Sequence, residues 1–434
     1  MARRSLYSGM TSNEFAATGA TAAITLPSPS GPKAPTAAGG GTGTNANGPE
    51  RASWLGVVSL GLGVFAIVMA EFLPASLLTR VASDLGVTEG VAGQSVSITA
   101  VVAAIAGLTI PVLLPRVDRR HLMLGLSALA VVSDVLVALA PNYPVLLAAR
   151  VLLGISLGGF WALAISITAR LVPADRLGRG LTVVNMGVSL ATVAAIPLGT
   201  WLGELWGWRA VFVLAAGVGV IAVVVQALVL PSVRSITATG FRPLLATLRS
   251  RLILIGLVST ALIAAGHFTG FTYIRPAATD IGGLDASQLA VLLVVYGAAV
   301  FAGNLVAGPL ADKRMRVAVL VFPVAIAAAM VTFALAGSTT AGIVVAVALW
   351  GLGFGAVPTT LTTWMARVEP DRLESVGGLQ SATFQLAIAL GAIVGGLLVD
   401  GIGVQTAFLV GGASALLGAI LLVSIKPRAA AFRG

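Results

Sequence analysis

The sequence contains no cysteine among its 434 residues, so it carries neither a disulfide framework nor a thiolate metal site. Only two histidines occur, His121 and His267, and they lie on distant segments. Two isolated imidazoles do not make a metal site, and we therefore expect no metal and no cofactor. Charged residues make up 10% of the chain against 57% hydrophobic residues, a balance that excludes a water-soluble domain.

Nucleic-acid-binding and enzymatic patterns are also absent. The formal net charge is +10, but the basic residues are scattered between apolar runs instead of clustering on one face. The chain has no Walker phosphate loop, no HExxH pair and no nucleophile elbow. We therefore expect no nucleic acid partner, no enzyme and no ATP hydrolysis. A membrane sensor would need an attached soluble signalling domain, and a membrane-embedded enzyme would need a clustered catalytic set. We expect neither, because the sequence shows no such domain and its ionisable residues within the spans are too few.

The beginning of the chain differs from the rest. It is rich in Ala, Gly, Thr, Ser and Pro and lacks an apolar stretch, so residues 1–52 are predicted to be a disordered cytoplasmic tail. Arg3 and Arg4 are not followed by an apolar core, which excludes a signal peptide. The first membrane helix would then act as the insertion signal itself.

Apolar runs of about 20 to 25 residues follow from Trp54 onward, each long enough to cross about 30 Å of hydrocarbon as a helix. They predict an all-α membrane protein with twelve transmembrane helices. We place the spans near residues 54–78, 90–114, 122–140, 145–169, 180–205, 210–231, 252–273, 287–310, 317–336, 341–365, 377–400 and 404–425.

Nearly all of the 26 Lys and Arg residues lie on one side of these spans, together with both tails. The exceptions are Arg80, Arg209 and Arg275 on the other side and Arg150 within a span. Because excess positive charge stays in the cytoplasm, we expect a multi-pass protein of the plasma (inner) membrane with both termini cytoplasmic. The lipid bilayer is then one partner, and a monomer is the expected state.

The two halves of the chain repeat in the same orientation. Residues 172–177 are echoed by residues 368–373, and both stretches end in Asp-Arg-Leu. Parallel repeats of six helices indicate a transporter whose halves rock about a midplane site. We expect an N-terminal six-helix bundle at 53–231, a cytoplasmic linker at 232–251, a C-terminal six-helix bundle at 252–425 and a cytoplasmic tail at 426–434.

Two loops carry a matching charged motif. Asp118 and Arg119 follow the second span, and Asp312 and Lys313 follow the eighth. They resemble the cytoplasmic Gly-x-x-x-Asp-Arg gating motif of the major facilitator superfamily, in which the Asp pairs with neighbouring helix ends to hold the inner gate closed. Leu114 stands in the first copy where the family has glycine. The resemblance covers residues 54–425 and implies the major facilitator fold.

Further motifs narrow the resemblance. Arg150 resembles the family's fourth-helix arginine motif, and Pro197 with Gly199 resembles the fifth-helix motif of antiporters. The drug/proton antiporter branch, and within it the purine ribonucleoside efflux pumps, are similar at residues 71–79, 89–95, 157–161, 170–173 and 271–276. The resemblance implies a proton-coupled antiporter that exports purine ribonucleosides and analogues, with protons and a small-molecule substrate as partners. A broad-specificity efflux transporter of amphipathic drugs or sugars is the alternative, and uptake by symport is a third possibility.

Ionisable side chains inside a span cost about 2.5 to 3.5 kcal/mol each and therefore need a partner or a purpose. Those found at a similar depth in the predicted spans are Glu71, Asp134, Arg150 and His267. We predict that they serve proton coupling, with Glu71 as the first choice. The alternative for Glu71 is a carboxylate at the outer mouth that hydrogen-bonds Gln94 or Ser97.

Asp134 and Arg150 flank the short turn at 141–144 at nearly equal distances, so an antiparallel helix pair would place them level. A buried ion pair is expected, with a structural role or with Arg150 modulating Glu71 or contacting substrate. His267 is of a residue type that titrates near physiological pH, and the resemblance places its helix at the cavity. A neutral histidine that packs between helices is the alternative.

Polar and aromatic residues in the apolar helices predict a polar cavity for a small organic solute, since polar groups there can satisfy ribose hydroxyls or amide-like groups. The alternative is that these polar residues form hydrogen bonds between helices. The predicted cavity residues are Gln94, Trp161, Asn185, Ser189, His267, Phe271, Tyr296, Asn304, Gln380 and Gln385. Phosphates are not expected as cargo, because the predicted cavity holds no basic cluster.

Overall fold

The computed structural model describes residues 53–233, 241–274, 277–278, 281–336 and 339–424. The chain divides into two units, Met1–Glu50 and Arg51–Gly434, and the description below concerns the second unit alone. The predicted tails at 1–52 and 426–434 lie outside the described residues. So does the stretch 234–240 of the predicted linker.

The N-terminal half consists of long helices whose starts are set by local capping. The Thr88 and Asn142 side chains accept hydrogen bonds from Val91 N and Val145 N, which satisfies backbone donors that the first helical turn leaves free. Asp118 caps the helix that begins at Arg119 in the same way, by accepting a hydrogen bond from Arg120 N. The helices are α1 (Trp54–Leu85), α2 (Glu89–Leu113), α3 (Arg119–Ala138), α4 (Tyr143–Leu171), α5 (Leu177–Trp206) and α6 (Trp208–Val229).

The C-terminal half has the same plan with one merged element. Its helices are α8 (Arg251–Phe271), α10 (Ala286–Ala336), α11 (Thr340–Val368), α12 (Leu373–Gly401) and α13 (Val404–Ser424). In α10 the backbone leaves the helical region at Arg314, with φ −143° and ψ 60°. At 51 residues, α10 would be about 76 Å long if straight, more than twice a bilayer core, so it provides two spans on either side of this kink.

The predicted fold class is confirmed. Among the described residues, eleven helices are long and apolar enough to span a membrane, and α10 accounts for the two predicted spans at 287–310 and 317–336. Each half also contains a short 3₁₀ turn before its fifth helix, η1 (Ala174–Arg176) and η2 (Pro370–Arg372). These turns are the two copies of the Asp-Arg repeat found in the sequence.

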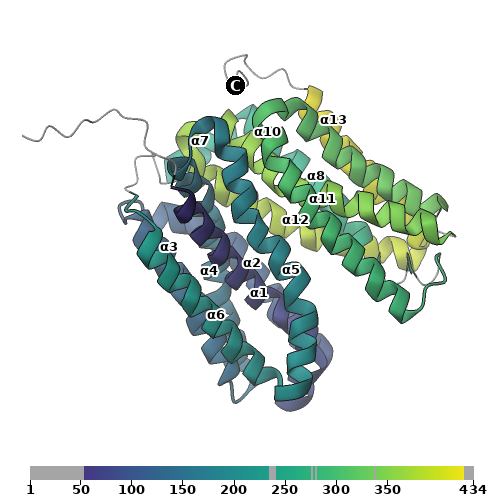
Figure 1. The fold of residues 1–434 in the computed structure, drawn as a ribbon, viewed down its shortest axis with the longest axis horizontal. Helices are drawn as coiled ribbons and strands as arrows, with labels where there is room; N and C mark the ends of the chain where they lie inside the picture. The colour runs from purple at the N-terminus through teal and green to yellow at the C-terminus, as the bar shows by residue number, and fades with distance from the viewer. Residues whose placement is uncertain (1–52, 234–240, 275–276, 279–280, 337–338, 425–434) are drawn as a thin grey trace, which may run out of the picture. The chain divides into compact units, whose positions relative to one another are not determined.

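The helices pair in the same way in both halves (Figure 1). In the first half α1 packs against α5 and α6, and α2 packs against α4. In the second half α8 packs against α12 and α13, and α10 packs against α11. The halves meet through two equivalent sets of contacts, α12 with α2 and α4, and α5 with α10 and α11. The internal repeat therefore extends from the sequence to the packing.

The predicted linker contains a short helix, α7 (Phe241–Arg249), which contacts α8, α12 and η2. Leu244 and Leu248 of α7 pack against the core, whereas Leu245 is 42% exposed. Figure 1 shows α7 at one end of the helices, and we call this the linker end. Large apolar side chains are exposed along the outer surfaces of both halves, as expected where helices face lipid.

Candidate functional site

Arg150 lies in the first third of α4 and is fully buried. Its guanidinium donates to backbone carbonyl oxygens of two other helices, at 2.9 Å to Ala70 O and 3.4 Å to Glu71 O in α1, and at 3.5 Å to Ser95 O in α2. A buried guanidinium needs such acceptors because its charge is expensive to remove from water. Arg150 thus joins three helices of the N-terminal half at one point.

Glu71 lies on α1 beside this guanidinium and is half-buried. Its carboxyl group is within electrostatic range of Arg150 and within hydrogen-bonding reach of the Gln385 side chain on α12. The side chains that the sequence offered as alternative partners, Gln94 and Ser97, are exposed on α2. Glu71 therefore lies where the N-terminal half approaches the C-terminal half.

Asp134 lies on α3 and is only 2% exposed, yet it forms no ion pair or hydrogen bond with any described residue, and its Oδ1 is unpartnered. The expected ion pair with Arg150 is therefore absent among the described contacts. The physical reason is the direction of the guanidinium, which turns toward the carbonyl groups of α1 and α2. Arg150 remains within electrostatic range of Asp134 without touching it.

His267 is fully buried on α8 in a cluster of aromatic rings. Its ring stacks on Phe354 at a centroid distance of 3.5 Å and lies nearly parallel to Phe271 at 5.1 Å. The indole Nε1 of Trp350 donates a hydrogen bond of 2.9 Å to His267 Nδ1. Nε2 of the same ring is buried and has no partner among the described residues.

Tyr296 on α10 belongs to the same cluster and is 4% exposed. Its ring lies 4.9 Å from Phe271 and 6.2 Å from Trp350, and its hydroxyl oxygen is also unpartnered among the described residues. Sequence reasoning found three members of this cluster but missed Trp350 and Phe354. Their spacing of four residues on one face of α11 is the signal that could have identified them.

Asn185 and Asn304, both predicted cavity residues, bind across the two halves instead of facing an open space. Asn304 donates to Thr182 O at 3.1 Å, and Thr182 donates to Asn304 O at 3.2 Å. Thr359 on α11 donates to Asn304 Oδ1 at 2.9 Å and accepts from the Asn185 amide at 3.1 Å. In this conformation these amides fasten α5 to α10 and α11.

The other predicted residues are spread over several helices. Ser189 donates to Asn185 O within α5, and Trp161 on α4 packs half-buried against the core. Gln380 on α12 is 6% exposed, and its Oε1 has no partner among the described residues. Pro197 and Gly199 both lie within α5, and Gly199 is buried.

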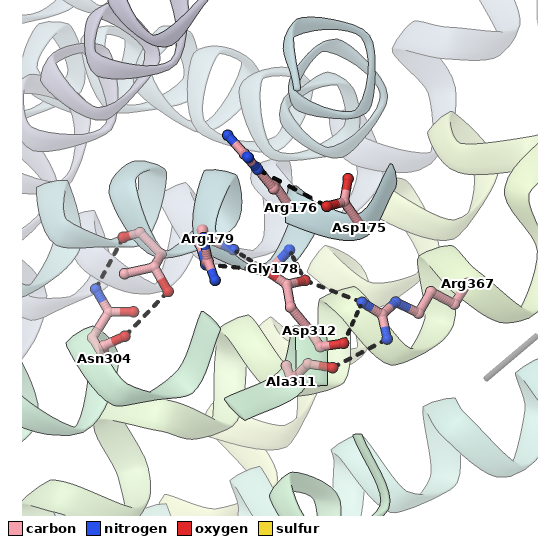
Figure 2. Close-up of polar contacts among 9 residues, drawn as sticks. Asp175, Arg176, Gly178, Arg179, Asn304, Ala311, Asp312 and Arg367 are labelled. Carbon is pink, nitrogen blue, oxygen red and sulfur yellow. Dashed lines mark hydrogen bonds and ion pairs between the residues drawn. The ribbon is translucent and has the colours of Figure 1, made fainter. Parts of the chain in front are cut away.

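Asp312 occupies the predicted gate position at the linker end. Its carboxylate accepts hydrogen bonds from Gly178 N at 2.8 Å and Arg179 N at 3.1 Å, at the first turn of α5 in the other half. Arg367 donates to the same carboxylate at 3.0 Å (Figure 2). An anion at a helix N-terminus is stabilised by the free backbone N–H groups there. Lys313 is exposed.

A glycine permits this contact. A Cβ added at Gly308, one turn before Asp312, would lie 2.4 Å from Thr182 Oγ1 and 2.5 Å from Gly178 O. Such distances require the two helices to move apart. Gly308 therefore lets α10 approach α5 closely enough for the Asp312 carboxylate to reach its N-terminus.

Asp118, at the equivalent position of the first half, binds no described residue of the other half. Its carboxylate caps its own helix through Arg120 N and accepts hydrogen bonds from Ser232 and from Val233 N at 3.3 Å. Partial burial raises the pKa of Asp118, but the hydrogen bonds from Ser232, Arg120 N and Val233 N outweigh it and hold the pKa below its usual value. Asp118 is therefore a carboxylate near neutral pH.

Arg119 makes the inter-half contact on this side. Its Nε and Nη2 donate to the two carboxylate oxygens of Glu374 at 2.7 Å each, and the two side chains are 1% and 3% exposed. Leu114 stands where the other copy has Gly308. We call the Arg119–Glu374 pair the latch.

Sequence reasoning identified Asp118, Arg119 and Asp312 but missed their partners Glu374 and Arg367. Glu374 follows the second Asp-Arg-Leu repeat directly, where the first copy has Gly178. An acidic residue that appears in only one of two repeats, in the first turn of a membrane helix, is a signal of a special contact.

Known proteins match the chain over most of its length. The profile of the Major Facilitator Superfamily matches residues 60–378. The transcription regulatory protein OpdE of Pseudomonas aeruginosa is 39% identical over 383 residues, which cover 87% of this chain and 95% of that protein. The purine ribonucleoside efflux pump NepI of Salmonella paratyphi B is 37% identical over 383 residues, 88% of this chain and 96% of that protein.

A solved structure gives the same picture of the fold. The crystal structure of the human organic anion transporter MFSD10 (TETRAN) matches with a TM-score of 0.67 and 20% sequence identity. The match covers 87% of this chain and all of that chain.

Proposed function

Because the chain belongs to the Major Facilitator Superfamily and is a multi-pass membrane transporter, we propose that it is a proton-coupled antiporter that exports an uncharged small organic solute. Purine ribonucleosides and their analogues are the leading cargo. The similarity to NepI over 88% of this chain is the observation that carries this assignment. The family consists of transporters, and an enzymatic activity is not part of the proposal.

Proton coupling is assigned to Glu71 and Arg150. The two groups lie within electrostatic range, and the carboxyl group of Glu71 also approaches Gln385 of the other half. A change in the protonation of Glu71 therefore changes its attraction both to α4 and to α12. A proton that binds Glu71 weakens both interactions, and the halves can then rearrange.

Alternating access would use the contacts at the linker end. The latch, the Asp312 contact with α5 and the Asn304 network all join the two halves near that end, and the latch is buried. We assign this end to the cytoplasm, with both termini cytoplasmic in the plasma membrane and the protein as a monomer. The structure then corresponds to a conformation closed toward the cytoplasm. In this conformation protons would reach Glu71 from the outside.

A broad-specificity exporter of amphipathic drugs or sugars is the second candidate, favoured by the cluster of aromatic rings around His267. Aromatic faces accept many flat apolar molecules by stacking. We assign His267 to substrate binding and not to proton coupling, because its Nδ1 already accepts a hydrogen bond from Trp350.

Counterflow of labelled inosine in proteoliposomes under an imposed pH gradient tests the proposal. Wild-type protein should move inosine against its gradient, and Glu71→Gln should lose gradient-driven movement while it retains inosine exchange. Glu204→Gln is the matched control, because Glu204 is an exposed carboxylate on α5 paired with Arg80. No inosine movement by protein that still transports an ethidium-like cation would refute the nucleoside assignment and support the second candidate.

A further inference from the structure

The Phe271 ring lies beside both residues of the aromatic cluster that have unpartnered polar atoms, His267 and Tyr296. Its ring lies 5.1 Å from the His267 ring and 4.9 Å from the Tyr296 ring, at angles of 21° and 32°. Phe271 is the last residue of α8, and its side chain is half-buried, whereas His267 and Tyr296 are buried. A half-buried ring at a helix end can turn away with little disturbance of the helix.

The hydrogen bond from Trp350 fixes the position of the proton on His267. An indole N–H can only donate, so Nδ1 of His267 must accept with its lone pair. A doubly protonated ring would set two N–H groups against each other at 2.9 Å. His267 is therefore neutral, carries its proton on Nε2 and presents an unused N–H donor.

Tyr296 supplies a second unused donor in the same cluster, since its hydroxyl oxygen is buried without a partner among the described residues. Buried polar groups in proteins are nearly always hydrogen-bonded, and exceptions call for an explanation. Two such groups, in rings that both neighbour the half-buried Phe271 ring, are explained together if a ligand completes their hydrogen bonds.

We infer that His267, Tyr296 and Trp350 form a subsite for an uncharged planar heteroaromatic ring, which enters when the Phe271 ring swings away. The ring of the ligand stacks where Phe271 lies, and nitrogen or oxygen acceptors on its edge bind His267 Nε2–H and the Tyr296 hydroxyl. This inference rests on the proposed transport function and deepens it, because it assigns which part of the cargo is recognised and by which groups.

The chemistry of the subsite favours ligands with an acceptor atom at the edge of the ring. Each of its unused polar groups can donate, and a nitrogen or oxygen lone pair on the ligand can accept from them. Stacking alone would tolerate most flat molecules, whereas a site built to donate hydrogen bonds rejects an analogue that lacks the acceptor. The subsite therefore predicts discrimination between two ligands that differ in one acceptor atom.

Ligand binding to purified full-length protein tests the inference, followed through the tryptophan fluorescence to which Trp350 contributes. The probes are inosine and 7-deazainosine, which differ by a ring nitrogen acceptor. Wild type should bind inosine roughly tenfold more tightly, a ratio typical of one buried hydrogen bond. His267→Leu should abolish the difference between the two probes, and His267→Gln, which retains an N–H donor, should restore part of it. His121→Leu is the matched control, because His121 is exposed.

The outcomes test the subsite separately from the proposed transport function. Absence of saturable binding of both probes to wild type would overturn the inference, whatever the transport assay shows. Equal discrimination by wild type and His267→Leu would also overturn it, even if inosine is transported. Binding with the expected ratio but without gradient-driven movement would uphold the subsite and refute the antiporter.

Discussion

Breaking the latch should open the linker end. Arg119 and Glu374 are joined by two hydrogen bonds of 2.7 Å, and both side chains are almost completely buried. Removing one member of such a pair leaves the other charge buried and unpaired, at a cost of about 3 to 5 kcal/mol. The cost falls on the conformation in which the halves are closed here, since opening returns the remaining charge to water. Glu374→Ala should thus shift the equilibrium toward the open conformation by roughly 150-fold or more.

The absence of cysteine makes this shift measurable. Ser166 is 5% exposed on α4, one turn from Ala162, and Ala162 O is the nearest atom to a Cβ added at Gly377 of α12. Ser166→Cys therefore introduces a single thiol between the halves. Its rate of maleimide labelling should rise by about two orders of magnitude when Glu374→Ala is added.

The double variant Arg119→Ala with Glu374→Ala is the decisive control. It removes both charges and leaves neither buried alone, so its labelling rate should lie well below that of either single variant. If each single variant labels at the wild-type rate, the latch does not hold the two halves together. If the double variant shows the sum of the single effects, the two side chains do not act as a pair.

Two further predictions concern the packing of single residues. Asp134→Asn should leave the melting temperature in detergent unchanged or raise it, because the buried carboxyl has no partner among the described residues. Loss of a buried ion pair would instead cost about 3 to 5 kcal/mol and clearly lower the melting temperature. Gly308→Ala should lower both the transport rate and the melting temperature, since its Cβ would lie 2.5 Å from Gly178 O. Gly217→Ala, where a Cβ meets nothing within 4 Å, is the control, and equal effects of the two glycine variants would refute the close-contact argument.

The spans were predictable from the sequence because a membrane helix requires a long apolar run, and such runs are visible without any knowledge of tertiary contacts. The kink at Arg314 falls between two predicted spans for the same reason, since the charged loop there could not lie in hydrocarbon. The parallel repeat was also visible, and η1 and η2 confirm that its two copies adopt the same local structure.

The partners within the site were not predictable in the same way. Asp134 and Arg150 were expected to pair because they lie at similar distances from one turn. Depth along a helix can be counted from the sequence, but the direction in which a side chain points depends on how each helix is rotated against its neighbours. Arg150 turns to carbonyl oxygens of α1 and α2, which belong to the backbone and leave no sign in the sequence.

The two gate motifs show a second limit. Asp118 and Asp312 occupy equivalent positions in the repeat, yet one binds the linker and the other binds the opposite half. The two copies also differ in sequence one turn before the Asp, with Leu114 in the first and Gly308 in the second. The choice of partner becomes visible only when the facing helix is in place.

The linker is attached on both sides of the latch. Val233 exchanges hydrogen bonds with Asp118 and Arg119 at the start of α3, while α7 packs against α12 and η2, next to Glu374. A chain fixed at these two places acts as a tether that keeps Arg119 and Glu374 at a high effective concentration after they separate. Re-formation of the pair is then an intramolecular event whose probability depends on the length of this connection.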